Sequence, residues 1–412
     1  MLLDDNPIAL IEENLERCLL CGRCRSVCPI FREVGLEMVS PRGRVALTSA
    51  LARGEISLSE VFKKQVVNCL RCMACVDICP SDVEPNETTT AVYRIIASSK
   101  VIDPIRGIMF RILLRRGRLL PPFTSFWANL FRILTPLLPE WTRLRHLLPL
   151  PTMKGIRYMP GFANMPFSYY IDYYNRVYRA GRWKHRVALF FGCASNLVFP
   201  ETAHSMIAVY IKHGIGVYIP PTQGCCGFPA GAYGDEKTRR KRLYEFERAF
   251  SGLDVDAVVT ICATCGHNLR EARENMLIAV PEVYDALVYL SEVADCRFKG
   301  ANSKVAYHIP CHLGRGQGAT EIVKRFLERA LGEQFAGMII EGECCGGGGV
   351  YNLIHPDIAF SIGEKKVGAF VESGADVLTT SCPSCKIFLT EVMAKRGLPE
   401  VKNVWEVLYD LI

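Results

Sequence analysis

Residues 255–265 read VDAVVTICATC and residues 375–385 read ADVLTTSCPSC, so a similar β-branched run leads into the same C-x2-C pair twice, 120 positions apart. Two further cysteine groups repeat with them, pairing Cys193 with Cys311, and Cys225 and Cys226 with Cys344 and Cys345. Similarity at a fixed distance along a chain is the sign of an internal repeat. The C-terminal half is therefore a duplication.

Each of four cysteine groups is preceded by a short run rich in β-branched and aromatic residues. These runs are residues 187–191, 255–261, 305–309 and 377–380. Helical patterns such as residues 236–250 and 320–331 lie between them. Strands that alternate with helices predict βαβ units with parallel strands, whose ligands gather at the carboxyl ends of the strands. We therefore expect a duplicated, Rossmann-like α/β domain with the cysteines at its site.

Each repeat brings five thiols to one crevice, although a cubane 4Fe–4S cluster needs four. The sets are Cys193, Cys225, Cys226, Cys262 and Cys265, and Cys311, Cys344, Cys345, Cys382 and Cys385. A fifth thiol and a vicinal pair favour a cluster with bridging thiolates, or one that leaves a position for a substrate sulfur. Gly227 and Gly346–Gly349 allow a tight turn beside the ligand. No dinucleotide or phosphate-loop fingerprint accompanies these glycines.

Three other interpretations of these ten cysteines are vicinal disulfides, two zinc sites, and buried structural thiols. A reducing compartment argues against disulfides, and complete five-cysteine sets at strand ends argue against structural thiols. We expect iron–sulfur clusters in one repeat or both. Cys296 belongs to neither set and is expected to be an ordinary thiol.

The N-terminal region carries another duplicated motif, C-x2-C-x2-C-x3-C-P, which is the spacing that holds cubane 4Fe–4S clusters. In that arrangement three thiolates hold one cluster and the fourth reaches the other. The predicted ligand sets are Cys18, Cys21, Cys24 and Cys79 for cluster 1, and Cys69, Cys72, Cys75 and Cys28 for cluster 2. Paired zinc sites are the alternative, but the doubled 2, 2, 3 spacing followed by proline disfavours them.

Composition limits the class of protein. Half of the 412 residues are hydrophobic and 22% are charged, as in a folded globular protein. Nineteen cysteines demand a chemical explanation, and the N-terminus lacks a signal-peptide pattern, so we expect a reducing cytoplasm. The net charge of +7 equals the charge of residues 104–149 alone, which argues against nucleic acid as a general partner.

Residues 104–149 contain eight arginines and one acid on amphipathic patterns that include Phe126 and Trp127. Such a segment is typical of a helix lying in a membrane interface, and packing on a partner subunit is an equal alternative. We expect a peripheral protein on the inner face of the membrane. The predicted organisation is α+β and multidomain, with a helical ferredoxin domain (1–100), a helical connector (101–184) and the two repeats (185–300 and 301–412).

These motifs together resemble the CCG-domain iron–sulfur oxidoreductases, and the chain looks like the D-type subunit of heterodisulfide reductase. It is similar also to the C-type subunit of anaerobic glycerol-3-phosphate dehydrogenase and to the glycolate oxidase iron–sulfur subunit. The segment between the N-terminal motifs, with Ser40–Arg44, resembles the ferredoxin domain of fumarate reductases and succinate dehydrogenases. Glycolate oxidase subunits often lack one cysteine of the terminal pairs, which this chain keeps.

The resemblance implies two functions. One is an electron-transfer subunit between a flavoprotein dehydrogenase, of the hydroxy acid or glycerol-phosphate type, and a membrane quinone or cytochrome b. The other is a catalytic subunit that reduces the coenzyme M–coenzyme B disulfide at a non-cubane 4Fe–4S cluster. The candidate substrate-facing cysteines for the second function are Cys311, Cys344, Cys345, Cys382 and Cys385.

Other features of the chain add to these hypotheses. We expect two cubane clusters, one or two further clusters, and neither flavin nor NAD on this chain. A zinc-organised assembly protein remains a third hypothesis. His267, His308 and His312 lie near the CCG cysteines, where they serve either the clusters or ordinary polar packing, and the same alternatives apply to Lys386.

Overall fold

The N-terminal region of the computed structural model is entirely helical. The structure describes residues 6–98, 161, 163–293, 298, 303–340, 342–349 and 351–412. The helices here are α1 (Pro7–Arg17), α2 (Arg23–Val27), α3 (Pro29–Val34), η1 (Glu37–Val39), α4 (Pro41–Ala52), α5 (Glu60–Val66), α6 (Ala74–Asp77) and α7 (Pro85–Ser98). Ser40 caps α4 by accepting from Gly43 N at 3.0 Å, with Pro41 at the first helical position.

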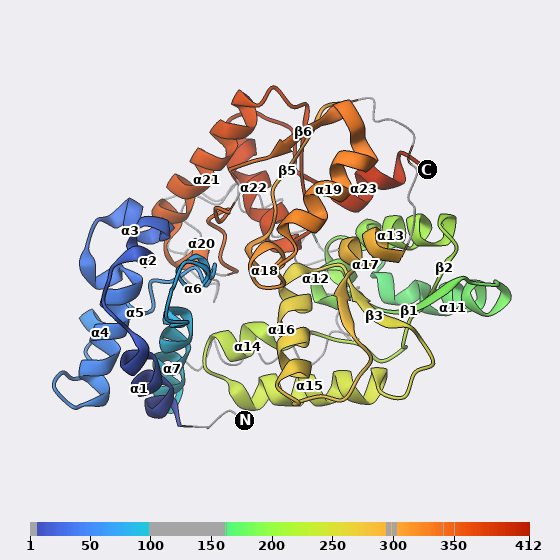
Figure 1. Cartoon of the computed structure of the whole chain (residues 1–412). Helices are drawn as coiled ribbons and strands as arrows, with labels where there is room; N and C mark the ends of the chain where they lie inside the picture. The colour runs from blue at the N-terminus through green and yellow to red at the C-terminus, as the bar shows by residue number, and fades with distance from the viewer. Residues whose placement is uncertain are drawn as a thin grey trace, which may run out of the picture.

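Two four-stranded parallel sheets form the C-terminal half (Figure 1). The first has the order β2-β1-β3-β4, with strands β1 (His185–Phe190), β2 (Ile215–Tyr218), β3 (Ala257–Thr260) and β4 (Val283–Asp285). The second has the equivalent order β6-β5-β7-β8, with strands β5 (Val305–Tyr307), β6 (Phe335–Met338), β7 (Val377–Thr380) and β8 (Lys402–Asn403). The chain order reverses beside the first strand of each sheet, which is where open α/β folds bind ligands.

Helices connect the parallel strands, as parallel pairing requires. η3 (Phe167–Tyr170) and α11 (Ile171–Ala180) precede β1 and lie in the predicted connector. Repeat 1 contains α12 (Gly192–Leu197), α13 (Pro200–Lys212), α14 (Phe228–Ala232), α15 (Glu236–Phe250), α16 (Ala263–Glu274) and α17 (Ala286–Val293). Repeat 2 contains α18 (Cys311–Gly314), α19 (Thr320–Leu331), η4 (Gly332–Gln334), α20 (Tyr351–Ile354), α21 (Pro356–Glu372), α22 (Pro383–Lys395) and α23 (Val404–Tyr409).

The two repeats share a hydrophobic core. Trp405 of α23 is fully buried against Tyr210 of α13, with ring centroids 5.9 Å apart. The Tyr210 hydroxyl donates to the carbonyl of Ala286 at 2.7 Å, which satisfies its polar atom inside that core. The same apolar cluster reaches Ile30 and Leu70 of the N-terminal helices. The described part of the molecule is thus held together by continuous packing.

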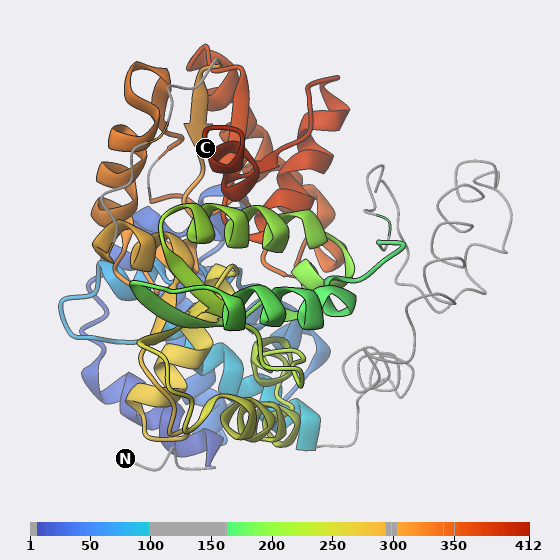
Figure 2. The same ribbon diagram turned by 90° about the vertical axis from the view of Figure 1, so that its right-hand side faces the viewer.

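The helical region lies against both repeats (Figures 1 and 2). Toward repeat 2, Tyr351 donates to Asn68 Oδ1 at 2.5 Å and Arg32 pairs with Glu343 at 2.5 Å. Toward repeat 1, Arg94 Nη2 lies 3.1 Å from Glu236 Oε2, and both side chains are largely buried. These contacts cross between regions far apart in the sequence, so the N-terminal clusters are placed beside the repeats.

The predicted α/β class of the repeats is confirmed. Each predicted strand run overlaps one of β1, β3, β5 and β7, and helices occupy the two predicted stretches, as α15 and α19. Residues 41–67, between the two N-terminal cysteine motifs, contain the helices α4 and α5. Most of the predicted connector, including residues 104–149, lies outside the described residues, as does Cys296. Among the residues that the structure describes, no helix has the length and apolar character to cross a bilayer.

Candidate functional site: cysteine centres joined across domains

The first N-terminal hollow, of about 400 Å³, lies between α2 and α6. Five cysteines border it: Cys18, Cys21, Cys24, Cys75 and Cys79. The structure thus brings Cys79 of the second motif to the three leading cysteines of the first motif, as the predicted ligand set for cluster 1 requires. Cys21 is exposed, so this hollow lies near the surface.

A second hollow, of about 300 Å³, is bordered by Cys28, Cys69, Cys72 and Cys75. This is the set predicted for cluster 2, with Cys28 of the first motif crossing to the second. Backbone amides aim at some of these sulfurs: Arg71 N donates to Cys69 Sγ at 3.4 Å. Grouped thiols with amide donors fit the requirements of a 4Fe–4S cluster, although cluster binding itself stays a prediction.

Arg44 gives the second hollow a buried positive charge. Its side chain is 1% exposed, and Nη1 donates to the carbonyls of Val39 at 3.2 Å and Asn68 at 2.9 Å. Burial opposes the charge of Arg44, but Cys69, Cys28 and the neighbouring cysteines outweigh it and raise its pKa. The Arg44 charge therefore complements a centre rich in thiolates.

The exposed hollow has its own arginine, Arg42, whose pKa is raised first by its hydrogen bond to Glu37 and further by Cys24 and Cys21. Arg42 Nε donates to Glu37 Oε1 at 2.6 Å. The sequence analysis assigned no role to Arg42 or Arg44. The available signal was their place at the start of a helix between two cysteine motifs.

The CCG cysteines occupy equivalent places in the two repeats. Cys193 and Cys311 follow the central strands β1 and β5, the vicinal pairs follow β2 and β6, and Cys262 and Cys382 follow β3 and β7. Cys262 and Cys382 are also the N-caps of α16 and α22. All ten cysteines thus lie at the carboxyl ends of strands, as predicted.

The glycine after each vicinal pair adopts a left-handed conformation, with φ of +91° at Gly227 and +95° at Gly346. A Cβ at Gly346 would lie 2.6 Å from the carbonyl oxygen of Ala359, so the tight turn expected from the sequence is confirmed. The turn also aims amides back at the thiols. Gly227 N donates to Cys225 Sγ at 3.5 Å, and Gly346 N donates to Cys344 Sγ at 3.4 Å.

Within each repeat the thiols contact one another. In repeat 2, Cys311 Sγ lies 3.9 Å from Cys344 Sγ, and Cys345 Sγ lies 3.5 Å from Cys385 Sγ. Hydrogen bonds from Cys344 and Cys385 lower the pKa of Cys345 well below its usual value. In repeat 1, hydrogen bonds from Cys193 and Cys226 do the same to the pKa of Cys225. Each crevice therefore holds at least one thiol whose pKa is lowered toward the thiolate that binds metal, while hydrogen bonds between thiols and burial raise the pKa of several of its neighbours.

Two thiol contacts join one site to another. A hydrogen bond between Cys72 and Cys344, followed by burial, raises the pKa of Cys72, so the cluster 2 hollow touches the vicinal pair of repeat 2. A hydrogen bond from Cys262 is the largest cause that lowers the pKa of Cys382, so the two repeats meet at their C-x2-C pairs. The cysteine sites are consequently contiguous.

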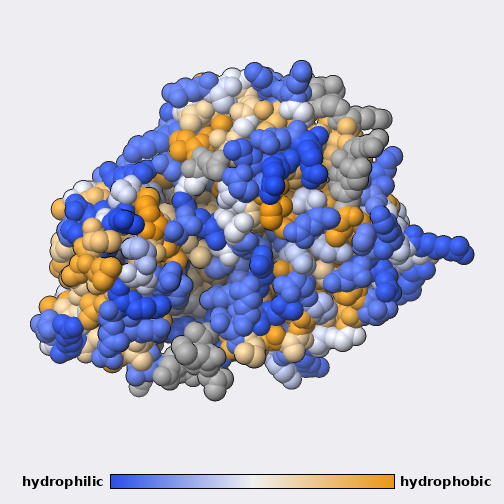
Figure 3. Space-filling model, viewed as in Figure 1, coloured by the Kyte–Doolittle hydropathy of each residue, from blue (hydrophilic) through white to orange (hydrophobic). Residues whose placement is uncertain are grey.

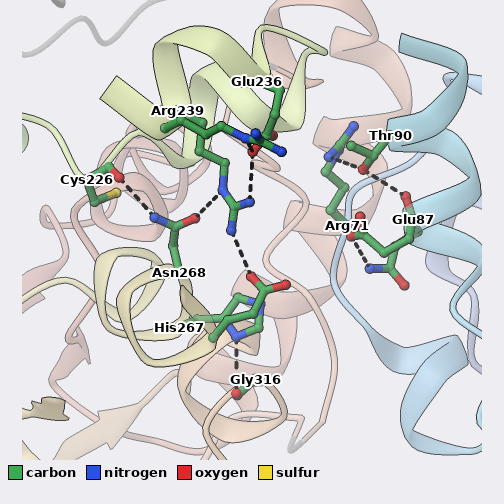
Figure 4. A network of polar contacts seen from close by, with 12 residues as sticks. Arg71, Glu87, Thr90, Cys226, Glu236, Arg239, His267, Asn268 and Gly316 are labelled. Carbon is green, nitrogen blue, oxygen red and sulfur yellow. Dashed lines mark hydrogen bonds and ion pairs between the residues drawn. The ribbon is translucent and has the colours of Figure 1, made fainter. Parts of the chain in front are cut away.

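A polar network connects the helical region to repeat 1 (Figure 4). Glu236 pairs with Arg94 of α7 at 3.1 Å and with Arg239 at 3.3 Å. Arg239 Nε donates to Asn268 Oδ1 at 3.1 Å, and Asn268 Nδ2 donates to the carbonyl of Cys226 at 2.9 Å. This series of polar contacts fixes the backbone of the vicinal cysteine pair of repeat 1 relative to the helical region.

The three histidines have different surroundings. His312 bonds Thr264 Oγ1 at 3.0 Å and the carbonyl of Arg71 at 3.2 Å, and burial lowers its pKa to about 4. His267 bonds the carbonyl of Gly316 at 3.1 Å. Both therefore serve the polar packing between domains, whereas His308 is fully buried near Cys345 and Cys385. Lys386 is a structural residue that pairs with Glu406 at 2.7 Å.

Exposure distinguishes the repeats. Cys193 of repeat 1 is exposed, but four of the five cysteines of repeat 2 are buried and Cys311 is half-buried. This difference favours repeat 1 as the centre that an external molecule reaches. The identification of repeat 2 as substrate-facing stays a prediction.

The chain is similar to proteins with matching cysteine motifs. Residues 14–83 match the 4Fe-4S dicluster domain, and residues 187–270 and 305–390 each match the cysteine-rich (CCG) domain. The probable glycolate oxidase iron-sulfur subunit of Bacillus subtilis is 27% identical over 94% of this chain and 91% of its own length. The glycolate oxidase iron-sulfur subunit of Escherichia coli is 27% identical over 98% of this chain and 96% of its own length.

A third relative comes from a methanogen. One subunit of the fumarate reductase (CoM/CoB) of Methanothermobacter marburgensis is 32% identical over 54% of this chain and 46% of its own length.

Proposed function

Because the chain belongs to the CCG-domain iron–sulfur oxidoreductase subunits, we propose that it is the electron-transfer subunit of a membrane-associated oxidoreductase. In this proposal a flavoprotein dehydrogenase, of the hydroxy acid or glycerol-phosphate type, lies on one side of the chain. A membrane quinone or cytochrome b lies on the other. The two full-length relatives named above, both glycolate oxidase iron-sulfur subunits, support an oxidoreductase of this kind.

The observation that carries the proposal is the contiguity of the cysteine sites. Cys75 borders both N-terminal hollows, Cys72 contacts Cys344, and Cys262 contacts Cys382. A subunit that carries electrons between two partners needs adjacent sites from one surface to another, and this row of cysteine sites supports that role.

The residues that would hold the clusters are the four sets of cysteines described above. Iron–sulfur clusters supply one-electron redox chemistry when bound, with potentials tuned by hydrogen bonds to sulfur, net charge and burial. The chain's residues provide that tuning. Amides of Arg71, Gly227 and Gly346 donate to sulfur, and Arg44 places a buried positive charge beside cluster 2.

The surface around cluster 1 supports docking of the flavoprotein partner there. Leu19, Leu20, Leu36 and Met38 are exposed by 71%, 51%, 49% and 42%, and Cys21 is exposed among them. In Figure 3 apolar residues gather over this left-hand part of the molecule, while most of the remaining visible face is hydrophilic. Exposed apolar side chains gathered in this way mark an interaction surface.

The second candidate function is a catalytic heterodisulfide reductase of the D type. Two observations favour it: the relative from M. marburgensis, and the retention of all ten CCG cysteines, with Cys193 exposed at repeat 1. In that case a disulfide substrate would reach a CCG centre directly. The row of cysteine sites would then feed that centre.

Electron paramagnetic resonance on the anaerobically purified chain tests the proposal. We expect reduced samples to contain signals from cubane clusters and CCG centres, with magnetic coupling between neighbouring sites. Oxidised samples treated with a panel of small thiols should not change. A paramagnetic signal that appears only with thiol would favour the reductase instead, and an iron content sufficient only for the N-terminal clusters would contradict a relay through the repeats.

A further inference from the structure

His308 occupies an unusual position at the end of β5. Its backbone N donates to the carbonyl of Thr379 at 2.8 Å, which fixes the residue beside the central strand of the sheet. The side chain is fully buried, and among the described residues no oxygen or nitrogen atom bonds either ring nitrogen, whose one hydrogen-bonding neighbour is the Cys345 thiol. Burying an imidazole with no stronger partner than a thiol is unfavourable. The position therefore calls for a ligand.

Two cysteines lie at the buried ring. A nitrogen of His308 and the sulfurs of Cys345 and Cys385 all lie within 4.8 Å of one another, and the two sulfurs are 3.5 Å apart. All three residues are buried. Two thiolates this close fit one metal ion better than two separate ions, and an imidazole nitrogen completes three corners of a tetrahedral site.

The duplication provides an internal comparison. His308 lies three residues before Cys311, and the residue three before Cys193 in repeat 1 is Phe190. Phe190 is buried against Phe246 and Phe250, with ring centroids 5.3 Å and 5.9 Å away. Packing alone is thus satisfied by an apolar ring at this place in the fold. Repeat 2 has a metal-binding ring there instead.

We propose that His308 is a nitrogen ligand of the iron centre in repeat 2, where it binds the same iron as Cys345 and Cys385. The centre of repeat 1 is then ligated by thiolates alone. This inference rests on the proposed iron–sulfur occupancy of repeat 2. It makes the two duplicated centres chemically different, because exchanging thiolate for imidazole ligands raises the reduction potential of an iron–sulfur cluster.

The test is pulsed electron paramagnetic resonance of the full chain, prepared anaerobically with natural or ¹⁵N-labelled histidine. We expect one centre to show the large nitrogen hyperfine coupling of a directly bound imidazole, and its frequency should change with the isotope. His308→Phe, which installs the residue of repeat 1, should abolish this coupling. His312→Ala also installs the residue of repeat 1 next to a cluster cysteine, but His312 is bonded elsewhere, so the coupling should remain.

His308→Cys keeps the proposal testable if His308→Phe fails to assemble. It supplies a thiolate at the same place, so iron content should be retained, the nitrogen coupling lost and the midpoint potential of that centre lowered. A repeat 2 signal with only weak nitrogen coupling in the wild type would overturn ligation by His308, and so would a strong coupling that survives both substitutions. Absence of any CCG signal or of the corresponding iron would instead overturn the proposed function.

Discussion

Arg44→Met should lower the reduction potential of cluster 2. Arg44 is buried beside Cys28, Cys69, Cys72 and Cys75. Reduction adds a negative charge to the cluster, so a fixed positive charge nearby stabilises the reduced state. Removing the charge removes that stabilisation.

The size of the effect follows from the contacts of Arg44. Its Nη1 donates at 2.9 Å to the carbonyl of Asn68, the residue before Cys69, so the charge lies one residue from the predicted ligands. A unit charge at a separation on the order of 6 Å and an effective dielectric constant of about 20 contributes about 3 kcal/mol. At about 2.3 kcal/mol per 100 mV, the midpoint potential should fall by roughly 100 mV.

A redox titration followed by electron paramagnetic resonance measures both N-terminal clusters in one sample. Arg44→Lys retains the charge and should give a much smaller shift. Arg42→Met is the matched control, because Arg42 lies at the surface beside Cys21 and Cys24, where solvent screens its charge. An unchanged potential for cluster 2 in Arg44→Met, with its cluster content intact, would refute the electrostatic role of Arg44.

Three further predictions concern the scaffold. Burial raises the pKa of Asp285 to about 7, so the folded state disfavours the carboxylate. Asp285→Asn should therefore raise the thermal midpoint at pH 8, with a gain in folding stability of at most about 4 kcal/mol, and this gain should vanish as the pH falls toward 4. An equal gain at both pH values would contradict the burial argument. Gly346→Ala should lower the iron content and destabilise the chain by at least about 2 kcal/mol, because its Cβ would meet the carbonyl oxygen of Ala359. Gly349→Ala, which has open space for its Cβ, should cost only about 1–2 kcal/mol, and equal urea denaturation midpoints for the two variants would refute the steric argument at Gly346. Replacing residues 104–149 with a Gly/Ser linker should release the protein from membranes with its iron content unchanged, and continued sedimentation with membranes would exclude that segment as the anchor.

The cysteine positions could be predicted because local sequence determines them. A β-branched run followed by C-x2-C specifies a strand end and a helix start, and the structure places Cys262 and Cys382 at both. The strands β2, β4, β6 and β8, which the sequence did not predict, each lie at an edge of their sheet, and length does not set them apart because β3, β5 and β7 are also four residues or shorter. Such strands are specified by their pairing partners rather than by their own residues.

The contacts between sites could not be predicted, because they join residues that are far apart in the sequence. No residue near Cys72 in the sequence indicates that Cys72 contacts Cys344. The sequence around Arg44 likewise does not indicate that its side chain is buried among thiols. The special position of His308 likewise depends on tertiary packing, which brings the sulfurs of Cys345 and Cys385 to its buried ring. Spacing predicts which cysteines form a set, whereas tertiary packing decides which sets touch.

The duplication gives two equivalent crevices, but their surroundings make them unequal. Repeat 2 meets the helical region through a thiol contact, Cys72 with Cys344, whereas repeat 1 meets it through the ion pair of Arg94 and Glu236. Repeat 1 in turn exposes Cys193. Under the proposed function, the centre of repeat 2 therefore lies next to cluster 2 inside the electron-transfer path. The centre of repeat 1 is the end of that path, which exchanges electrons with a partner or substrate. Unequal reduction potentials give a relay its direction. With His308 as a ligand, the centre of repeat 2 has a different reduction potential from the centre of repeat 1, although the two repeats share one fold.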